Sequence, residues 1–90
     1  MVLTEKTLDE ILNYLDNSIS KLSQETVDNP EFQMNDANLE EFLSNQYEIR
    51  LGNLLQRKNS DIHHLESGMK NKIIQRKQKR IDTIMKNFTN

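Results

Sequence analysis

A single proline divides this chain of 90 residues, and apolar side chains recur at helical spacing on both sides of it. Before Pro30, the apolar residues follow alternating steps of four and three, the seam of an amphipathic helix: Leu8, Leu12, Leu15, Ile19 and Leu22. After Pro30 there is no further proline, and the whole chain holds two glycines. Tight turns depend largely on glycine and proline, so this composition argues against a β fold and predicts an all-α protein.

We expect the first helix at about residues 5–26. Thr4 and Thr7 are both candidates for its N-cap, and the run from Thr7 to Glu10 has the Thr-x-x-Glu form of a capping box. The helix should end before Pro30, because proline disfavours the helical conformation of the residue that precedes it.

Residues 27–37 are expected to form a connecting loop. Asp36 or Asn38 is the expected N-cap of the next helix. Phe32 and Met34 are apolar residues in this otherwise polar stretch. They either fold back over the end of a helical hairpin or serve as a hook for a partner.

Residues 38–87 carry an apolar pattern that barely pauses, which predicts one long second helix. A break near 59–61 is the alternative, because Asn59 and Ser60 compete with helical backbone bonds and Asp61 is a good N-cap. Continuity is favoured because seven residues separate Leu55 from Ile62, so the apolar face keeps its phase. The prediction is a single helical domain over residues 1–90. It is a helix–loop–helix hairpin with a short first helix and a long second helix, packed in a coiled coil or helical bundle.

The lengths of these two helices predict an uncovered apolar stripe. At 1.5 Å per residue the second helix would span about 75 Å and the first only about 33 Å. A stripe of that length does not stay exposed on a soluble monomer. We therefore expect another helical protein, or further copies of this chain, to cover it. The expected partner-binding residues are Ile62, Leu65, Met69, Ile73, Ile74, Ile81, Ile84 and Phe88.

Charge is strongly divided along the chain. Residues 1–48 carry eleven acidic and two basic side chains, and residues 49–90 carry ten basic and three acidic ones. The bases that form a candidate face for a charged partner are Lys70, Lys72, Arg76, Lys77, Lys79 and Arg80. Four interpretations stay open for this face: the solvated back of a helix, an acidic partner such as the acidic half of this same chain, nucleic-acid phosphates, and, least favoured, an anionic membrane surface.

No arrangement in the sequence predicts catalysis, a cofactor or a metal. The chain has no cysteine, and its two glycines are too far apart for a phosphate-binding loop. The adjacent pair His63-His64 would point about 100° apart on a helix, so the two rings would not chelate one ion together. No apolar run is long enough for a membrane span, and the N-terminal residues do not resemble a signal peptide. We therefore expect an intracellular protein, cytoplasmic by default.

These patterns favour a non-enzymatic subunit or adaptor of a helical assembly. One alternative is non-specific binding of nucleic acid by the basic helix at residues 69–86. A second alternative is a small export chaperone or anti-factor that masks a helix of its partner.

Overall fold

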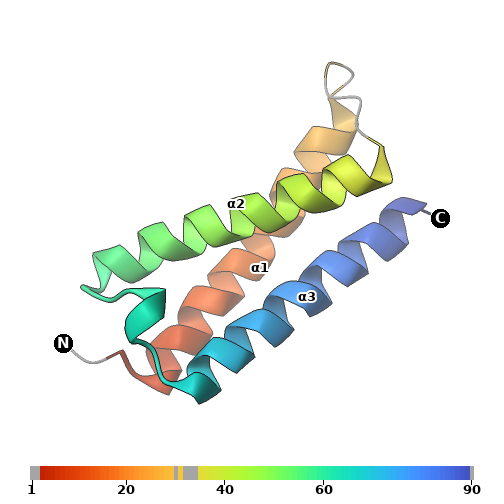
Figure 1. The fold of residues 1–90 in the computed structure, drawn as a ribbon. Helices are drawn as coiled ribbons and strands as arrows, with labels where there is room; N and C mark the ends of the chain where they lie inside the picture. Colours follow the sequence, from red (N-terminus) through yellow and green to blue (C-terminus); the bar gives the residue numbers. More distant parts are fainter. Residues whose placement is uncertain (1–2, 30, 32–34, 90) are drawn as a thin grey trace.

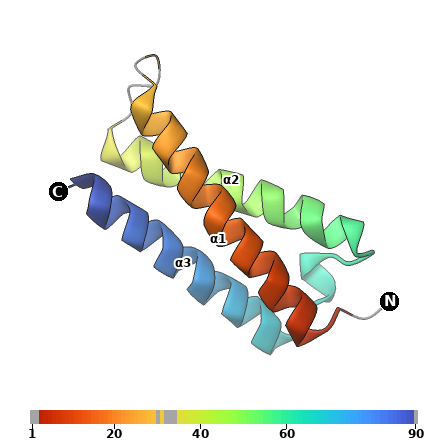
Figure 2. The ribbon, with the colours of Figure 1, turned by 180° about the vertical axis from the view of Figure 1, so that it is seen from behind.

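Three helices pack side by side in the computed structural model, which describes residues 3–29, 31 and 35–89 (Figure 1). They are α1 (Glu5–Asp28), α2 (Asp36–Arg57) and α3 (Ser67–Thr89), with a short 3₁₀ helix, η1 (Ile62–His64), between α2 and α3. The chain reverses direction after α1 and again after α2, as the opposite view also shows (Figure 2). The described residues contain no strand, so the prediction of an all-α helical bundle is confirmed.

The prediction of one long helix over residues 38–87 is wrong, because α2 ends at Arg57. The amide of Asn59 donates to the Gln56 carbonyl at 2.9 Å, and the amide of Ser60 donates to the Leu55 carbonyl at 2.9 Å. These two hydrogen bonds form a Schellman motif, which ends a helix where the residue after the C-cap adopts the left-handed conformation. Asn59 supplies that conformation with a φ of 55°.

The break therefore lies at the site that the sequence offered as the alternative. Asp61 begins the next element, since its carboxylate accepts a hydrogen bond from the His63 amide at 3.1 Å. The seven-residue spacing from Leu55 to Ile62, which favoured a continuous helix, does not place the two residues on one face. Leu55 is fully buried, whereas Ile62 is 37% exposed on η1. The two residues do not share a helix face, because the chain leaves the helix between them.

Substitutions at Asn59 should report on this turn. Asn59→Val is expected to lower the free energy of unfolding by about 1 kcal/mol, because a β-branched residue adopts the left-handed conformation only with strain. Asn59→Gly should match or exceed the wild-type stability, since glycine has no Cβ to clash. Urea titration of the three proteins measures the difference. Equal midpoints for the valine and glycine variants would contradict a left-handed turn at this residue.

Local polar groups set the other helix ends. Thr4, one of the two predicted N-caps, accepts a hydrogen bond from the Thr7 amide at 3.1 Å, and α1 extends to Asp28, two residues beyond the expected end. The N-cap of α2 is neither of the predicted residues but Asn35, which accepts from the Asn38 amide at 2.8 Å. The predicted roles of Phe32 and Met34 fall on residues outside the described part of the chain.

All three helices contribute to one apolar core, and every pair of helices is in contact. The 4-3 seam of α1 supplies its centre, where Leu8, Leu12, Leu15 and Ile19 are completely buried. The α3 helix lies against both other helices, and its residues Met69, Ile73 and Ile81 are also buried in this core. Most of the apolar face of α3 is therefore covered by α1 and α2.

Candidate interaction surface

The residues predicted to bind a partner fall into two groups. Leu65, Met69, Ile73 and Ile81 are at most 8% exposed and belong to the core of the same chain, with Ile84 partly buried against it. The reason for assigning them to a second chain was an uncovered helix, and that reason does not hold, because α3 folds back on the bundle. Ile62 and Ile74 are exposed, at 37% and 63%, so their role in binding stays a prediction. The side chain of Phe88 lies outside the described set.

Most of the predicted basic face of α3 points at acids of the same chain. Lys72 Nζ lies 2.9 Å from Glu5 Oε2 and 2.7 Å from Asp9 Oδ1 on α1. Lys77 Nζ lies 2.8 Å from Glu48 Oε1 on α2. The hydrogen bonds to Asp9 and Glu5 raise the pKa of Lys72 above its usual value.

Asp16 is the centre of a second group of charges between α1 and α3. Its Oδ2 lies 2.8 Å from Arg76 Nη2 and 3.6 Å from Arg80 Nη2, and Arg76 Nη2 also donates to Asn13 Oδ1 at 2.9 Å. The hydrogen bond with Asp16 raises the pKa of Arg76. Four of the six predicted bases are thus paired with the acidic half of the chain, which leaves Lys70 and Lys79 without an ion pair among the described residues.

Three buried polar atoms at this position have no hydrogen-bond partner among the described residues: Asp16 Oδ1, Tyr47 OH and Arg80 Nε. Tyr47, on α2, is completely buried. Burial, and secondarily the negative charge of Asp16, raise the pKa of Tyr47 from 10.0 to about 12. The phenol therefore stays neutral in the folded protein well beyond the pH at which a free tyrosine ionises.

Removal of the Asp16 carboxylate should destabilise the bundle measurably. Asp16→Ala is expected to lower the free energy of unfolding by about 1–2 kcal/mol, because it leaves two arginines beside a buried phenol without their counter-charge. This loss of unfolding free energy is smaller than for a fully buried ion pair, since the side chains of Arg76 and Arg80 are 29% and 35% exposed. Urea unfolding measures the change. The exposed Glu10, also on α1, provides the control Glu10→Ala, and a loss no larger than the control's would contradict a stabilising role for Asp16.

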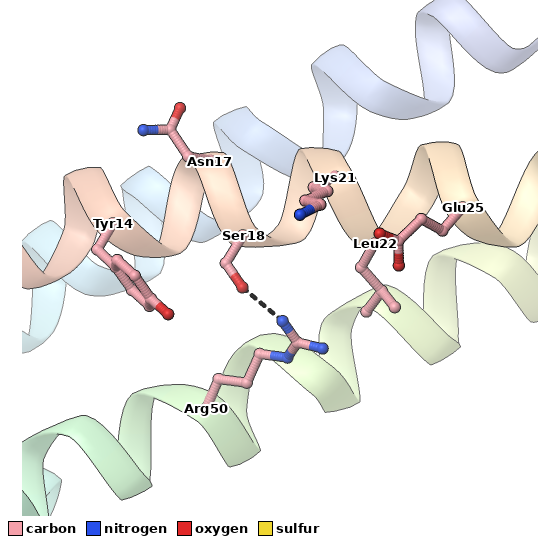
Figure 3. A pocket seen from close by; sticks show the side chains of 7 residues that line it. All are labelled: Tyr14, Asn17, Ser18, Lys21, Leu22, Glu25 and Arg50. Carbon is pink, nitrogen blue, oxygen red and sulfur yellow. Dashed lines mark hydrogen bonds between the residues drawn. The ribbon is translucent and has the colours of Figure 1, made fainter.

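Side chains of α1 and α2 line a hollow on the surface between the two helices (Figure 3). One hollow of about 440 Å³ is lined by Tyr14, Asn17, Ser18, Lys21, Leu22, Glu25 and Arg50. A second hollow of about 170 Å³ shares Tyr14, Ser18 and Arg50 with the first and adds Asn53, Leu54 and Arg57. We call these two adjoining hollows the α1–α2 groove.

Tyr14 and Arg50 line both hollows of the α1–α2 groove. Tyr14 is 61% exposed, and Arg50 reaches from α2 to donate a hydrogen bond to the hydroxyl of Ser18 on α1. Neither residue is among those predicted from the sequence to bind a partner. A signal was present for Tyr14, which is an aromatic residue of the first helix outside its leucine seam. No comparable signal exists for Arg50, because its place opposite Ser18 depends on how the two helices pack.

The described residues hold no group of three or more histidine, cysteine, aspartate or glutamate side chains placed to bind a metal ion. His63 and His64 are both exposed on η1. In the same part of the chain, no helix combines the length and apolar character that crossing a membrane requires.

Neither a protein family, nor a curated protein, nor a solved structure matches this chain.

Proposed function

We propose that this protein is a non-enzymatic protein–protein interaction module, a small helical bundle that acts as a subunit or adaptor in a larger assembly. The observation that carries this proposal is the α1–α2 groove, where the 61% exposed Tyr14 lies beside Arg50. Tyrosine and arginine are among the residues in which binding energy concentrates at protein interfaces. A small export chaperone or anti-factor that masks a helix of its partner falls within the same class.

A different protein is a better candidate for the partner than further copies of the chain. Obligate oligomers bury a large apolar surface between their subunits. In this chain most of the apolar residues of α3 are already buried or partly buried within the bundle. We therefore propose that the chain is folded before it binds its partner, and that the partner is not needed to cover its core.

Nucleic-acid binding through residues 69–86 has less support. A phosphate approaching Lys72, Arg76 or Lys77 would have to displace the acid that each base pairs with, which leaves only Lys70 and Lys79 of the predicted face without such a competitor among the described residues. Those carboxylates are held on the same chain, so they compete at a high effective concentration.

Affinity capture with the tagged full chain tests the proposed function. The chain is incubated with an extract of the cells that make it, with and without nuclease and at two salt concentrations. We expect discrete proteins to be retained in a nuclease-resistant complex that persists at higher salt. Phosphate contacts would instead weaken steeply between about 50 and 200 mM salt. Recovery of nucleic acid alone, or of nothing beyond the tag control, would contradict the proposal.

A further inference from the structure

The basic residues of α1 and α2 are concentrated in the α1–α2 groove. Together these two helices carry ten acidic and four basic side chains. Three of the four bases, Lys21, Arg50 and Arg57, line the groove, together with a single acid, Glu25. A positively charged groove thus lies between two helices that are acidic as a whole.

The bases of the groove differ from those of α3 in their partners. Every ion pair among the described residues uses a base of α3, and none uses Lys21, Arg50 or Arg57. Arg50 donates to Ser18, a neutral hydroxyl. A guanidinium has five N–H donors in a planar fork that suits a carboxylate, so Arg50 retains capacity for such a ligand.

Apolar side chains lie beside these charges. Leu22 and Leu54 are half-buried in the lining of the groove, and Tyr14 is exposed. From Tyr14 to Glu25 the α1 side of the groove extends about 17 Å at 1.5 Å per residue, which corresponds to about three turns of a helix laid along it.

We propose that the α1–α2 groove binds an acidic amphipathic helix of a partner protein, with a carboxylate on Arg50 and apolar side chains against Tyr14 and Leu54. This proposal rests on the proposed function and specifies its partner. An amphipathic helix fits because it carries its apolar and acidic side chains at i, i+3 and i+4 along one face. A nucleic-acid backbone fits less well, since its closely spaced phosphates would pass Glu25 as well as the bases.

A displayed library of helical peptides, panned on the folded full chain, tests the proposal. We expect the enriched peptides to combine Asp or Glu with an apolar stripe. Arg50→Gln and Tyr14→Ala should each weaken their binding by about tenfold or more, the loss of one charge-assisted or one aromatic contact. Lys79→Gln and Ile74→Ala make comparable changes on α3, at a base without an ion pair among the described residues and at an exposed apolar residue. They test the α3 surface against the groove, and neither should change binding. Circular dichroism verifies that each variant is folded.

Charge reversal makes the test specific for the contact with Arg50. Arg50→Glu should reject an enriched acidic peptide and bind the same peptide again when its essential acid is replaced by lysine. Enriched peptides that respond to Ile74→Ala and not to the groove variants would overturn the groove and leave the interaction module standing. A library that yields no binder, or only basic ones, would overturn the acidic helix. Light scattering that shows a dimer lost in Arg50→Gln, or an oligonucleotide bound through Arg50, would also overturn it by identifying another occupant.

Discussion

Replacing Ile73 by aspartate is expected to unfold the whole bundle, including α1. Ile73 is 3% exposed in the core shared by the three helices. A carboxylate without a partner in such a site costs several kcal/mol. A domain of this size is held by only about 5–10 kcal/mol in total, so the variant should lose most of its helical signal in far-ultraviolet circular dichroism at 25 °C.

Ile74→Asp is the matched control for this prediction. The neighbouring side chain is 63% exposed, so the same chemical change should alter the free energy of unfolding by about 0.5 kcal/mol or less. The two variants also distinguish the observed three-helix bundle from the predicted hairpin with one long second helix. In a hairpin with an uncovered second helix, Ile73→Asp would abolish association and leave the first helix intact. A folded, monomeric Ile73→Asp variant that keeps the helical signal of α1 would therefore contradict the packing of α3.

Strong alkali is expected to destabilise the wild-type protein through Tyr47. Burial raises the pKa of this phenol from 10.0 to about 12, so its neutral form is favoured in the folded state. This contribution to stability is complete below pH 10, the pKa of the unfolded chain, and is lost as the pH rises from about 10 to about 12. The expected loss is about 2–3 kcal/mol, since two pKa units correspond to that free energy.

Tyr47→Phe isolates this effect from other groups that titrate in alkali. The pKa of Lys72 is also raised, so its ion pairs with Asp9 and Glu5 likewise lose their contribution as the pH rises through the folded-state pKa. Denaturant titrations of both proteins across this range give the difference that belongs to Tyr47. Near neutral pH the variant should be within about 1 kcal/mol of wild type, because the hydroxyl has no hydrogen-bond partner among the described residues. Parallel pH profiles up to pH 12 would refute a buried phenol.

The proposed interaction surface was harder to predict from the sequence than the helices were. The basic run of α3 predicted a face for a charged partner because its bases lie close together in the sequence. In the structure, however, Lys72 and Arg76 are paired with acids more than 50 positions away. The α1–α2 groove went unrecognised because Arg50, Tyr14 and Ser18 are isolated in the sequence and meet only when two helices pack. A run of charges in the sequence reflects only local composition. A binding surface depends on which side chains stay exposed and without an ion pair after the helices have packed.

The sequence by itself determined the class of fold, the course of the first helix and the need to cover a second apolar stripe. These properties follow from the 3.6-residue period and from capping groups within a few residues of one another, such as Thr4 and Thr7. Only the tertiary structure decided that the chain turns at Asn59 and that α3 lies on α1 and α2. The hydrogen bonds of that turn are local, but the spacing of the apolar residues on its two sides, Leu55 and Ile62, also fits a continuous helix. The balance is set by the burial of Met69, Ile73 and Ile81 against residues far away in the chain, which no local pattern records.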